Sequence, residues 1–478
     1  MAVLDYLEPK RVFSFFEQLC AIPHGSRNNT QMSNFLAEFA RSRGLEYMQD
    51  AAENVVIIKE ASPGYEQAEP VILQGHMDMV CEKDPDCTKD MATEGLDLVV
   101  DGDRIFARGT TLGGDDGIAV AMALALLDAD DIPHPRLEVI ITTDEEMGME
   151  GAFAVDVSAL RARRMLNLDS EDEGVFTVSC AGGVRTRLRV PYVREEFAGT
   201  ALSITIDGLL GGHSGAEIHK GRANADILMG RLLYAARKAV ALRLVSVEGG
   251  LKDNAIPTAS RAIVVTENAD VLRGVCEEMQ EIFRSEYSVT DGGIQITVAD
   301  SAATMAMDEA STARVVAMLV CGPDGVQVMS ADIPGLVQTS LNLGVVYTDE
   351  TAVVGKFAIR SSVESQKRML ADRVTCLGEL LGAEIDTAGD YPGWAYRQDS
   401  PLRDLMRETY LDLYGKEPRI EAIHAGLECG LFAGKIPGLD CVSFGPDLKD
   451  IHTPRETMFI GSVQRTWQLL LEILRRMK

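Results

Sequence analysis

The chain has 478 residues, of which 46% are hydrophobic and 25% are charged. This length exceeds the size at which one hydrophobic core stops growing, so we expect two domains. The 73 acidic and 46 basic residues give a formal charge of −27, which disfavours nucleic acid and anionic membranes as partners. Nine cysteines without CxxC pairs argue against a disulfide framework, and no apolar run is long enough to span a membrane. We therefore expect a soluble cytoplasmic protein.

The first part of the chain predicts strands that alternate with helices. A helical pattern covers 7–43, and a small, apolar helix is predicted at 117–128. The strand candidates are 54–59, 71–73, 137–142 and 165–168. This alternation is typical of the α/β class, in which a mainly parallel sheet is covered by helices. In such sheets ligands bind beyond the carboxyl ends of the strands.

After residue 183 the pattern changes to alternating strands with amphipathic helices. The predicted strands are 201–206, 262–265 and 294–298, and the predicted helices are 223–239, 269–287, 311–320 and 366–381. The order resembles a split βαβ unit, followed by a second, less regular copy that continues to about residue 386. The α/β pattern returns with a helix at 402–414, a strand at 441–444 and a helix at 463–477. We predict a discontinuous domain of 1–183 and 387–478, interrupted by an inserted α+β domain at 184–386 with internal duplication.

A histidine and a carboxylate follow the strand candidate at 71–73, in the segment GHMDMV. Side chains alternate along an extended backbone, so Asp78 projects on the same side as His76 and can orient its ring. Metal-bound histidines usually donate their second N–H to such an acceptor. The acidic turn GGDDG, which contains Asp115, comes shortly before the predicted helix. Together, these segments indicate the start of a two-metal site.

Further candidate ligands also come directly after predicted strands. Two divalent metals need a bridging carboxylate and terminal ligands on each side. The candidate set is His76, Asp115, Glu146, Asp169 and His452. These nitrogen and oxygen ligands suit zinc, and they also accept manganese or cobalt. Glu145 is not needed as a ligand, and a free carboxylate beside metal-bound water is the natural general base.

Each of these residues also has a purely structural interpretation. The His-x-Asp segment could be an incidental strand end, and Asp115 with Asp116 could form a solvated helix N-terminus. Glu145 and Glu146 could lie in a surface turn, and Asp169 could cap a helix. Because all of these positions occur at the strand ends of one predicted sheet, the metal site explains them better together.

Eight motifs occur in a fixed order along nearly the whole chain. They are HMDMV, TTLGGDDG, TTDEEMGMEGA, LNLDSEDEG, GGHSGAEIHKGRANA, DNAIP, HAGLECG and IHTPRE. Together they resemble metallopeptidase family M20, and specifically its aminoacyl-histidine dipeptidase (Xaa-His dipeptidase) branch. The resemblance implies a zinc-peptidase catalytic domain that is interrupted by an enlarged lid domain.

The resemblance also implies two Zn²⁺ ions per chain and assigns their ligands. It places His76 and Asp169 on one ion, Glu146 and His452 on the other, and Asp115 between them. Asp78 then orients His76, and Glu145 is the catalytic base. The turn departs from the Ala-Asp-Asn-Gly that is frequent in relatives, and Asp116 adds a negative charge near the bridge.

The inserted domain carries candidate substrate contacts. His213 lies in GGHSG, where glycines allow a close backbone approach, and the resemblance implies that its imidazole donates to the tetrahedral oxyanion. The resemblance implies that Arg360 matches an arginine with which family members bind the substrate carboxylate. The planar guanidinium of arginine is suited to this contact. Asn254 is a similar polar contact, and Glu428 is the first candidate for binding the free amine. A structural role is the alternative for each of these residues.

We therefore predict a dizinc dipeptidase that hydrolyses unblocked dipeptides, including Xaa-His and β-alanyl-histidine types. An aminoacylase or carboxypeptidase-like amidohydrolase of the same fold is the alternative enzyme. A metal-binding scaffold with a decayed site is the non-enzymatic alternative, and the presence of Glu145 argues against it. The metal used in the cell, the dipeptide preference and homodimer formation stay open, as does whether His213 acts in its own chain or across a dimer.

Overall fold

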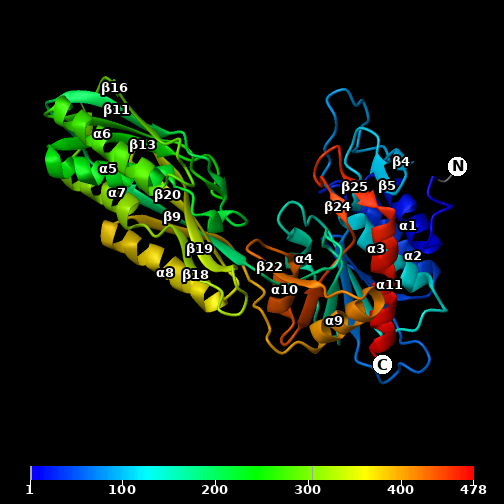
Figure 1. Cartoon of the computed structure of the whole chain (residues 1–478). Coiled ribbons are helices and arrows are strands. Elements are labelled where there is room, and N and C mark those ends of the chain that lie inside the picture. The colour runs from blue at the N-terminus through cyan, green and yellow to red at the C-terminus, as the bar shows by residue number, and fades with distance from the viewer. Residues whose placement is uncertain (1–2, 304) are drawn as a thin grey trace. The chain divides into compact units, whose positions relative to one another are not determined.

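The computed structural model describes residues 3–303 and 305–478, which divide into two units (Figure 1). The first unit contains the described residues up to Ser179 together with Tyr396–Ala422 and Leu427–Lys478. The second unit contains Cys180–Ala395 and the short segment Ile423–Gly426. The boundaries between the units, near Ser179 and Ala395, lie close to the domain boundaries predicted at 183/184 and 386/387. The predicted domain boundaries themselves stay a prediction.

The first unit is built on an eight-stranded sheet with the order β1-β2-β6-β3-β7-β23-β8-β22. The strands are β1 (Glu46–Gln49), β2 (Val55–Lys59), β3 (Val71–His76), β6 (Leu137–Thr142), β7 (Arg164–Asn167), β8 (Val175–Cys180), β22 (Arg419–Ile423) and β23 (Asp440–Ser443). The central strands β6, β3, β7 and β23 run parallel, whereas β1–β2, β2–β6 and β23–β8 pair antiparallel. Every residue of β3 and β6 is buried, as in a sheet covered on both faces. The predicted α/β class is confirmed, and the parallel part is the middle of the sheet.

Helices surround this sheet. They are α1 (Lys10–Cys20), α2 (Thr30–Ser42), α3 (Gly114–Asp128), α4 (Glu150–Ala154), α9 (Pro401–Tyr414), α10 (Glu428–Lys435) and α11 (Ile460–Arg476). The helix α3 is apolar on all sides and packs against α1 and β3, so it is buried along almost its whole length. The predicted helical stretch 7–43 is two helices, because the chain turns between them at a segment that contains Pro23.

A small four-stranded sheet joins two distant parts of the first unit, with the order β24-β25-β5-β4. Its strands are β4 (Leu98–Asp101), β5 (Arg104–Ala107), β24 (Leu448–Lys449) and β25 (Thr457–Phe459). The strand candidates from the sequence did not include β4 and β5, because such short strands give little periodic signal. The pairing of Met458 with Ile105 fixes the loop that contains His452 beside the segment that leads to the Asp115 turn.

The second unit is built on a nine-stranded sheet with the order β16-β11-β15-β13-β19-β20-β9-β21, and β18 pairs with β19. The long strands are β9 (Gly182–Pro191), β11 (Thr200–Asp207), β13 (Leu242–Gly249), β15 (Ser260–Thr266), β16 (Gln295–Asp300), β18 (Gly325–Met329), β19 (Val337–Thr348), β20 (Ala352–Ser361) and β21 (Glu384–Tyr391). Short pairs outside this sheet are β10 (Arg194–Glu196) with β17 (Met305–Met307) and β12 (Gly212–His213) with β14 (Ala255–Ile256). Figure 1 shows the helices α5 (Ala225–Ala239), α6 (Ala269–Glu286), α7 (Glu309–Cys321) and α8 (Glu364–Leu381) lined up along this sheet.

Two copies of the same topology make up this sheet, which confirms the internal duplication. The series β11-α5-β13-β15-α6-β16 has the spatial order β16-β11-β15-β13, and the series β9-α7-β19-β20-α8-β21 has the equivalent order β21-β9-β20-β19. The prediction of two successive copies was wrong, because one copy begins at β9 and the other is inserted between β9 and α7. A strand that pairs with partners far along the chain gives no local signal of this nesting.

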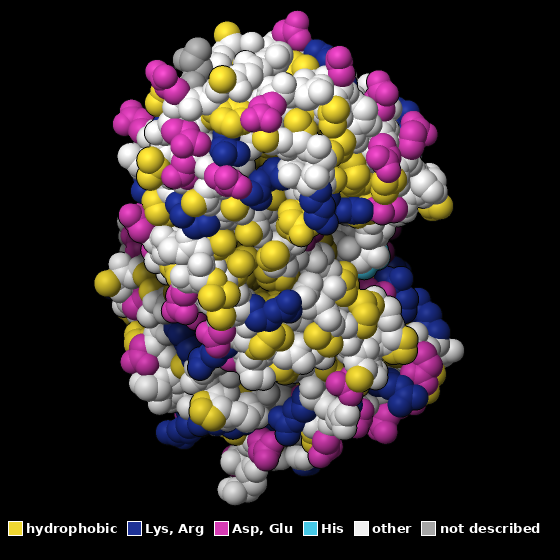
Figure 2. All heavy atoms as spheres, turned by 90° about the vertical axis from the view of Figure 1, so that its left-hand side faces the viewer, with side chains coloured by type: hydrophobic (Ala, Val, Ile, Leu, Met, Phe, Trp, Pro, Cys, Tyr) yellow, Lys and Arg dark blue, Asp and Glu magenta, His cyan; other side chains and the backbone are white. Residues whose placement is uncertain are grey.

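The surface shows no helix suited to a membrane and no segregation of charge on the face drawn. Among the described residues, no helix has the length and apolar character that crossing a membrane requires. Figure 2 shows acidic side chains interspersed with Lys and Arg on this face of the molecule. The excess of acidic residues therefore forms no field of a single sign there.

Candidate metal centre and substrate contacts

The five predicted metal ligands come together at the carboxyl ends of the central strands in the first unit. They are His76 at the end of β3, Asp115 in the first turn of α3, Glu146 after β6, Asp169 after β7, and His452 between β24 and β25. Three groups of side chains have ligand atoms within 4.8 Å of one another: His76–Asp116–Asp169, His76–Glu145–Glu146 and Asp115–Glu146–His452. Because the groups share members, they form one continuous cluster.

The Asp115 carboxylate lies between the two histidines of this cluster. Its Oδ1 is 3.2 Å from His76 Nε2, and its Oδ2 is 3.2 Å from His452 Nε2. Glu146 Oε1 is 2.8 Å from His452 Nε2, and Asp169 Oδ1 is 3.6 Å from His76 Nε2. A carboxylate that directs one oxygen to each of two sites, each with its own imidazole and terminal carboxylate, has the arrangement of a bridging ligand.

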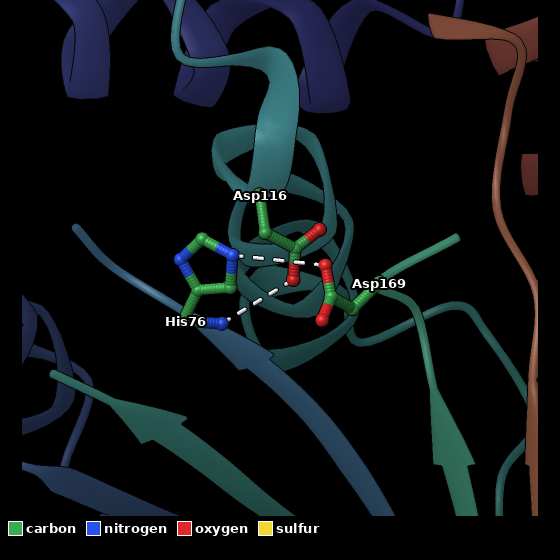
Figure 3. Close-up of side chains that lie close together, drawn as sticks. All are labelled: His76, Asp116 and Asp169. Carbon is green, nitrogen blue, oxygen red and sulfur yellow. Dashed lines mark hydrogen bonds and ion pairs between the residues drawn. The ribbon is translucent and has the colours of Figure 1, made fainter. Parts of the chain in front are cut away.

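The neighbouring carboxyl group of Asp116 lies on the His76 side only. Figure 3 shows that Asp116, at the start of α3, approaches both His76 and Asp169. Its Oδ2 accepts a hydrogen bond from the backbone N–H of His76 at 3.2 Å, and its side chain is buried against Gly75. Burial and the negative charge of Asp169 raise the pKa of Asp116 well above its usual range. Asp116 therefore lies beside His76 and Asp169 and does not share the position of Asp115 between the two histidines.

Asp78 anchors several parts of the cluster at once. His76 Nδ1 is 2.9 Å from the backbone oxygen of Asp78 and 3.5 Å from its Oδ1. The same carboxylate accepts hydrogen bonds from the backbone N–H of Glu145 at 3.0 Å and of Glu146 at 3.4 Å, and from the Ser26 hydroxyl at 2.8 Å. Asp78 is therefore placed to orient the His76 ring and also to hold the turn that carries the two glutamates.

The electrostatics of the cluster fit a divalent cation. Burial and neighbouring carboxylates raise the pKa of Glu145 well above its usual range and that of Asp169 to about 6. Hydrogen bonds to Asp115 and Glu146 raise the pKa of His452 to about 10. The cluster thus attracts protons, and metal ions bound to the two imidazoles would neutralise the same negative charge.

Glu428 lies inside the first unit at the start of α10. Its side chain is fully buried, and its Oε2 accepts hydrogen bonds from Gln74 and from Thr142 Oγ1 at 2.9 Å. Burial raises the pKa of this carboxyl to about 7. Its other oxygen has no hydrogen-bond partner among the described residues. The predicted contact of Glu428 with a substrate amine stays a prediction, and it requires this second oxygen to become accessible.

In the second unit, His213 and Asn254 lie side by side. The strands β12 and β14 pair His213 with Ala255, and the backbone N–H of Ser214 donates to the Asn254 carbonyl at 2.8 Å. Both residues line a cavity of about 820 Å³. The backbone N–H groups of Gly215 and Ala216 donate to His213 Nδ1 at 3.2 and 3.0 Å. The ring hydrogen must therefore be on Nε2, where it is available to donate.

Arg360 of β20 lies close to His213 without an acidic partner. Its Nη1–H donates to the Tyr391 hydroxyl at 3.2 Å, and its buried Nε has no hydrogen-bond partner in the part of the chain that the structure describes. None of the carboxylates in the described part of the chain forms an ion pair with it. A Cβ atom on Gly215 would lie 3.1 Å from Arg360 Nε and 3.0 Å from His213 Cε1. Gly215 therefore lies tightly between the two side chains.

His424 joins this group although it follows β22 of the first unit. The same Cβ position on Gly215 is only 2.5 Å from the His424 backbone oxygen. The His424 side chain is buried, and its Nε2 is 2.7 Å from Ser340 Oγ. Burial, followed by the positive charge of Arg360, lowers the pKa of His424 to about 3. The imidazole is therefore neutral at physiological pH.

Several contributors to these clusters were missed by sequence reasoning. They are Ser26, Gln74, Thr142, His424 and Glu456. Gln74 precedes His76 by two residues on the same strand, so the alternation of side chains could have revealed it. Glu456 lies within the motif IHTPRE. His424 is the first residue of the motif HAGLECG, although its contacts are with distant segments. Ser26 also contacts a distant segment, and no local pattern marks it.

A mixed α/β sheet whose central strand ends gather two imidazoles among carboxylates is suited to hold metal ions. The model of peptidase family M20/M25/M40 matches residues 72–476, so the chain belongs to this family and is a peptide hydrolase. This confirms the family resemblance of the motifs.

Full-length relatives agree with this assignment. The chain is 38% identical over 481 residues to the cytosol non-specific dipeptidase of Escherichia coli, and the alignment covers 99% of each chain. The crystal structure of aminoacylhistidine dipeptidase from Vibrio alginolyticus superposes on this chain with a TM-score of 0.94 at 36% identity. The superposition covers 99% of this chain and 98% of the dipeptidase chain. A tripeptidase of Staphylococcus aureus has a TM-score of 0.57 at 16% identity, over 98% of this chain and 99% of its own, and shares the fold.

Proposed function

We propose that this chain is a cytoplasmic dipeptidase that uses two zinc ions to hydrolyse unblocked dipeptides, including Xaa-His and β-alanyl-histidine types. The observation that carries the proposal is the position of Asp115, with one carboxylate oxygen directed to each of the two histidines. The two full-length relatives described above are named as dipeptidases, which supports the substrate class.

The metal ligands in this proposal are divided into two sets around Asp115. His76 and Asp169 would hold one ion, and Glu146 and His452 would hold the other. This division follows the pairs that lie close together, since Asp169 is near His76 and Glu146 is near His452. When bound, the ions supply an acidified water and polarise the scissile carbonyl.

Glu145 is the proposed general base. Its carboxylate lies in a group with His76 and Glu146, within 4.8 Å, and it is the member that is not required as a ligand. Glu145 takes a proton from the attacking water and then delivers it to the leaving amine nitrogen. Burial raises the pKa of this carboxyl above its usual range, which makes it a stronger base for the first step.

The second unit supplies the proposed contacts for the rest of the substrate. His213 carries its hydrogen on Nε2 and donates it to the developing oxyanion. Arg360 binds the free C-terminal carboxylate, because its guanidinium forms no ion pair with a described acidic group. Asn254 is a polar contact beside His213, and Glu428 is retained as the candidate for the amine.

Metal removal and a substrate panel test this proposal. The purified protein is treated with a chelator, and the hydrolysis of dipeptides, dipeptide amides and N-acetyl amino acids is measured before and after addition of Zn²⁺ or Mn²⁺. We expect unblocked dipeptides to be cleaved fastest, activity to vanish on chelation, and metal to restore it. Faster cleavage of N-acetyl amino acids would instead favour an aminoacylase. A protein that holds two zinc ions but cleaves no dipeptide would refute the proposal.

A further inference from the structure

One buried carboxylate accepts four hydrogen bonds from the turn that carries Asp115. Glu456 is 2% exposed. Its Oε2 accepts from the backbone N–H of Leu112 at 2.8 Å and of Gly113 at 3.1 Å, and its Oε1 accepts from Gly114 at 2.8 Å and Asp115 at 3.3 Å. These four consecutive donors enclose a single side chain.

The local sequence makes this enclosure possible. The first N–H groups of a helix have no partner within it, and α3 begins at Gly114, so an acceptor with negative charge is favourable there. A Cβ atom on Gly114 would lie 3.2 Å from Glu456 Oε1. Gly113 has φ +67° and a Cβ there would lie 2.8 Å from Met79 Sδ. The glycine pair therefore allows the amides to surround the carboxylate.

Glu456 also belongs to the loop that carries His452. Its backbone N–H donates to the Thr453 carbonyl at 3.0 Å, and β25 begins at the next residue. His452 itself adopts a left-handed backbone conformation with φ 59°. The Glu456 side chain thus joins this loop to the Asp115 turn, and Asp115 Oδ2 is 3.2 Å from His452 Nε2.

We propose that Glu456 is a positioning residue of the metal centre. It holds the bridging carboxylate of Asp115 at the correct separation from His452 and so sets the affinity of the ion bound by Glu146 and His452. This inference rests on the two-metal function proposed above. Glu456 is not itself a ligand, since its two oxygens are occupied by backbone amides.

A second buried glutamate provides a matched control. Glu138 of β6 is also fully buried, and its oxygens accept from the backbone N–H groups of Arg161 and Ala162 at 3.0–3.1 Å and from Arg136 Nε at 3.1 Å. The segment that it holds carries no proposed ligand. A purely structural role for Glu456 would make Glu138→Gln and Glu456→Gln behave alike.

The experiment compares Glu456→Gln, Glu456→Asp and Glu138→Gln with the wild-type holoenzyme. Zn²⁺ affinity is measured by competition with a chromophoric chelator, the site geometry by the visible spectrum of the Co²⁺ form, and kcat and KM on a dipeptide. In Glu456→Gln the amide NH₂ meets two backbone donors. In this variant, we expect the ion held by Glu146 and His452 to dissociate about 10- to 100-fold more readily, and we expect the Co²⁺ spectrum to change. Added Zn²⁺ should recover kcat while KM stays unchanged.

The two remaining variants define how the result is interpreted. Glu456→Asp keeps the charge on a shorter side chain and should show an intermediate loss of affinity, whereas Glu138→Gln should lower thermal stability without changing metal affinity. Wild-type Zn²⁺ affinity in Glu456→Gln, or in Glu456→Asp if the first variant does not fold, would overturn this inference and leave the proposed function standing. A wild-type protein that binds no pair of zinc ions would overturn the proposed function as well.

Discussion

The two units hold clusters of opposite character. In the first unit, carboxylates surround His76 and His452, and the structure raises the affinity of the cluster for protons and cations. In the second unit, Arg360 and His213 lie around Gly215, and Arg360 forms no ion pair with a described carboxylate. A cluster of acceptors suits metal ions, and a cluster of donors suits a carboxylate or an oxyanion. Each unit thus offers the chemistry that the other lacks.

Two histidines show how strongly the surroundings decide this difference. Hydrogen bonds to Asp115 and Glu146 raise the pKa of His452 to about 10. Burial, followed by the positive charge of Arg360, lowers the pKa of His424 to about 3. The residue type is the same, and the neighbours alone determine whether the imidazole is charged. Four predictions test this contrast between the units.

The largest effect is expected for Glu145→Gln in the first unit. Loss of the proposed general base should lower kcat by about 10²- to 10⁴-fold, because proton transfer is no longer assisted. The zinc content should remain at two ions, and Glu150→Gln, at an exposed glutamate in the same region, should leave kcat unchanged. Kinetics and metal analysis measure both quantities. Loss of zinc from Glu145→Gln would instead make Glu145 a ligand.

The next effect concerns the donor cluster, through His213→Ala. Removing one oxyanion donor should lower kcat by about 10²- to 10³-fold with little change in zinc content. His219, exposed in the turn that follows, provides the control His219→Ala. Mixing inactive His213→Ala with inactive Glu145→Gln chains adds a further measurement. Recovered activity in the mixture would show that His213 acts across a dimer.

A smaller effect is expected for Arg360→Ala. Loss of hydrogen bonds to a charged group costs about 1.5–3 kcal/mol, which corresponds to a rise in KM of roughly 10- to 150-fold for dipeptides. Arg360→Lys should recover little of this, since an ammonium lacks the planar fork. Dipeptide amides, which lack the carboxylate, should show the same KM with the variant as with wild type. An equal rise for both substrates would refute the carboxylate contact.

The smallest effect is expected for Asp226→Asn in the core of the second unit. Burial raises the pKa of Asp226 from 3.8 to about 7, and a hydrogen bond with Ser260 offsets only part of this rise. The folded state therefore holds a proton that the unfolded state releases near pH 3.8. The stability from this group is complete below that pH and is lost as the pH rises through about 7.

Thermal unfolding between pH 4 and 8 measures this effect. We expect Asp226→Asn to flatten the fall in melting temperature over this range, because the variant has no proton to lose. Asp372→Asn, at an exposed position of α8, serves as the control and should follow the wild-type curve. A wild-type slope in Asp226→Asn would contradict the raised pKa.

Much of the first unit was predictable because its signals are local. The strand predicted at 71–73 forms and continues to His76, and the candidate ligands gather at the strand ends because parallel strands place their carboxyl ends at one edge. The features that the sequence did not predict also have physical explanations. The strands β4 and β5 are too short for a periodic pattern, and the nesting of the two copies in the second unit depends on which distant strands pair.

The amino-acid sequence by itself determined the α/β class, the peptidase family and the residues that gather at the strand ends. These follow from alternation over neighbouring residues and from motifs, which need no knowledge of distant contacts. Only the tertiary structure decided that Glu456 accepts from four amides of the Asp115 turn and that His424 lies against Gly215. Those contacts join segments far apart in the chain, so they exist only once packing has brought the segments together.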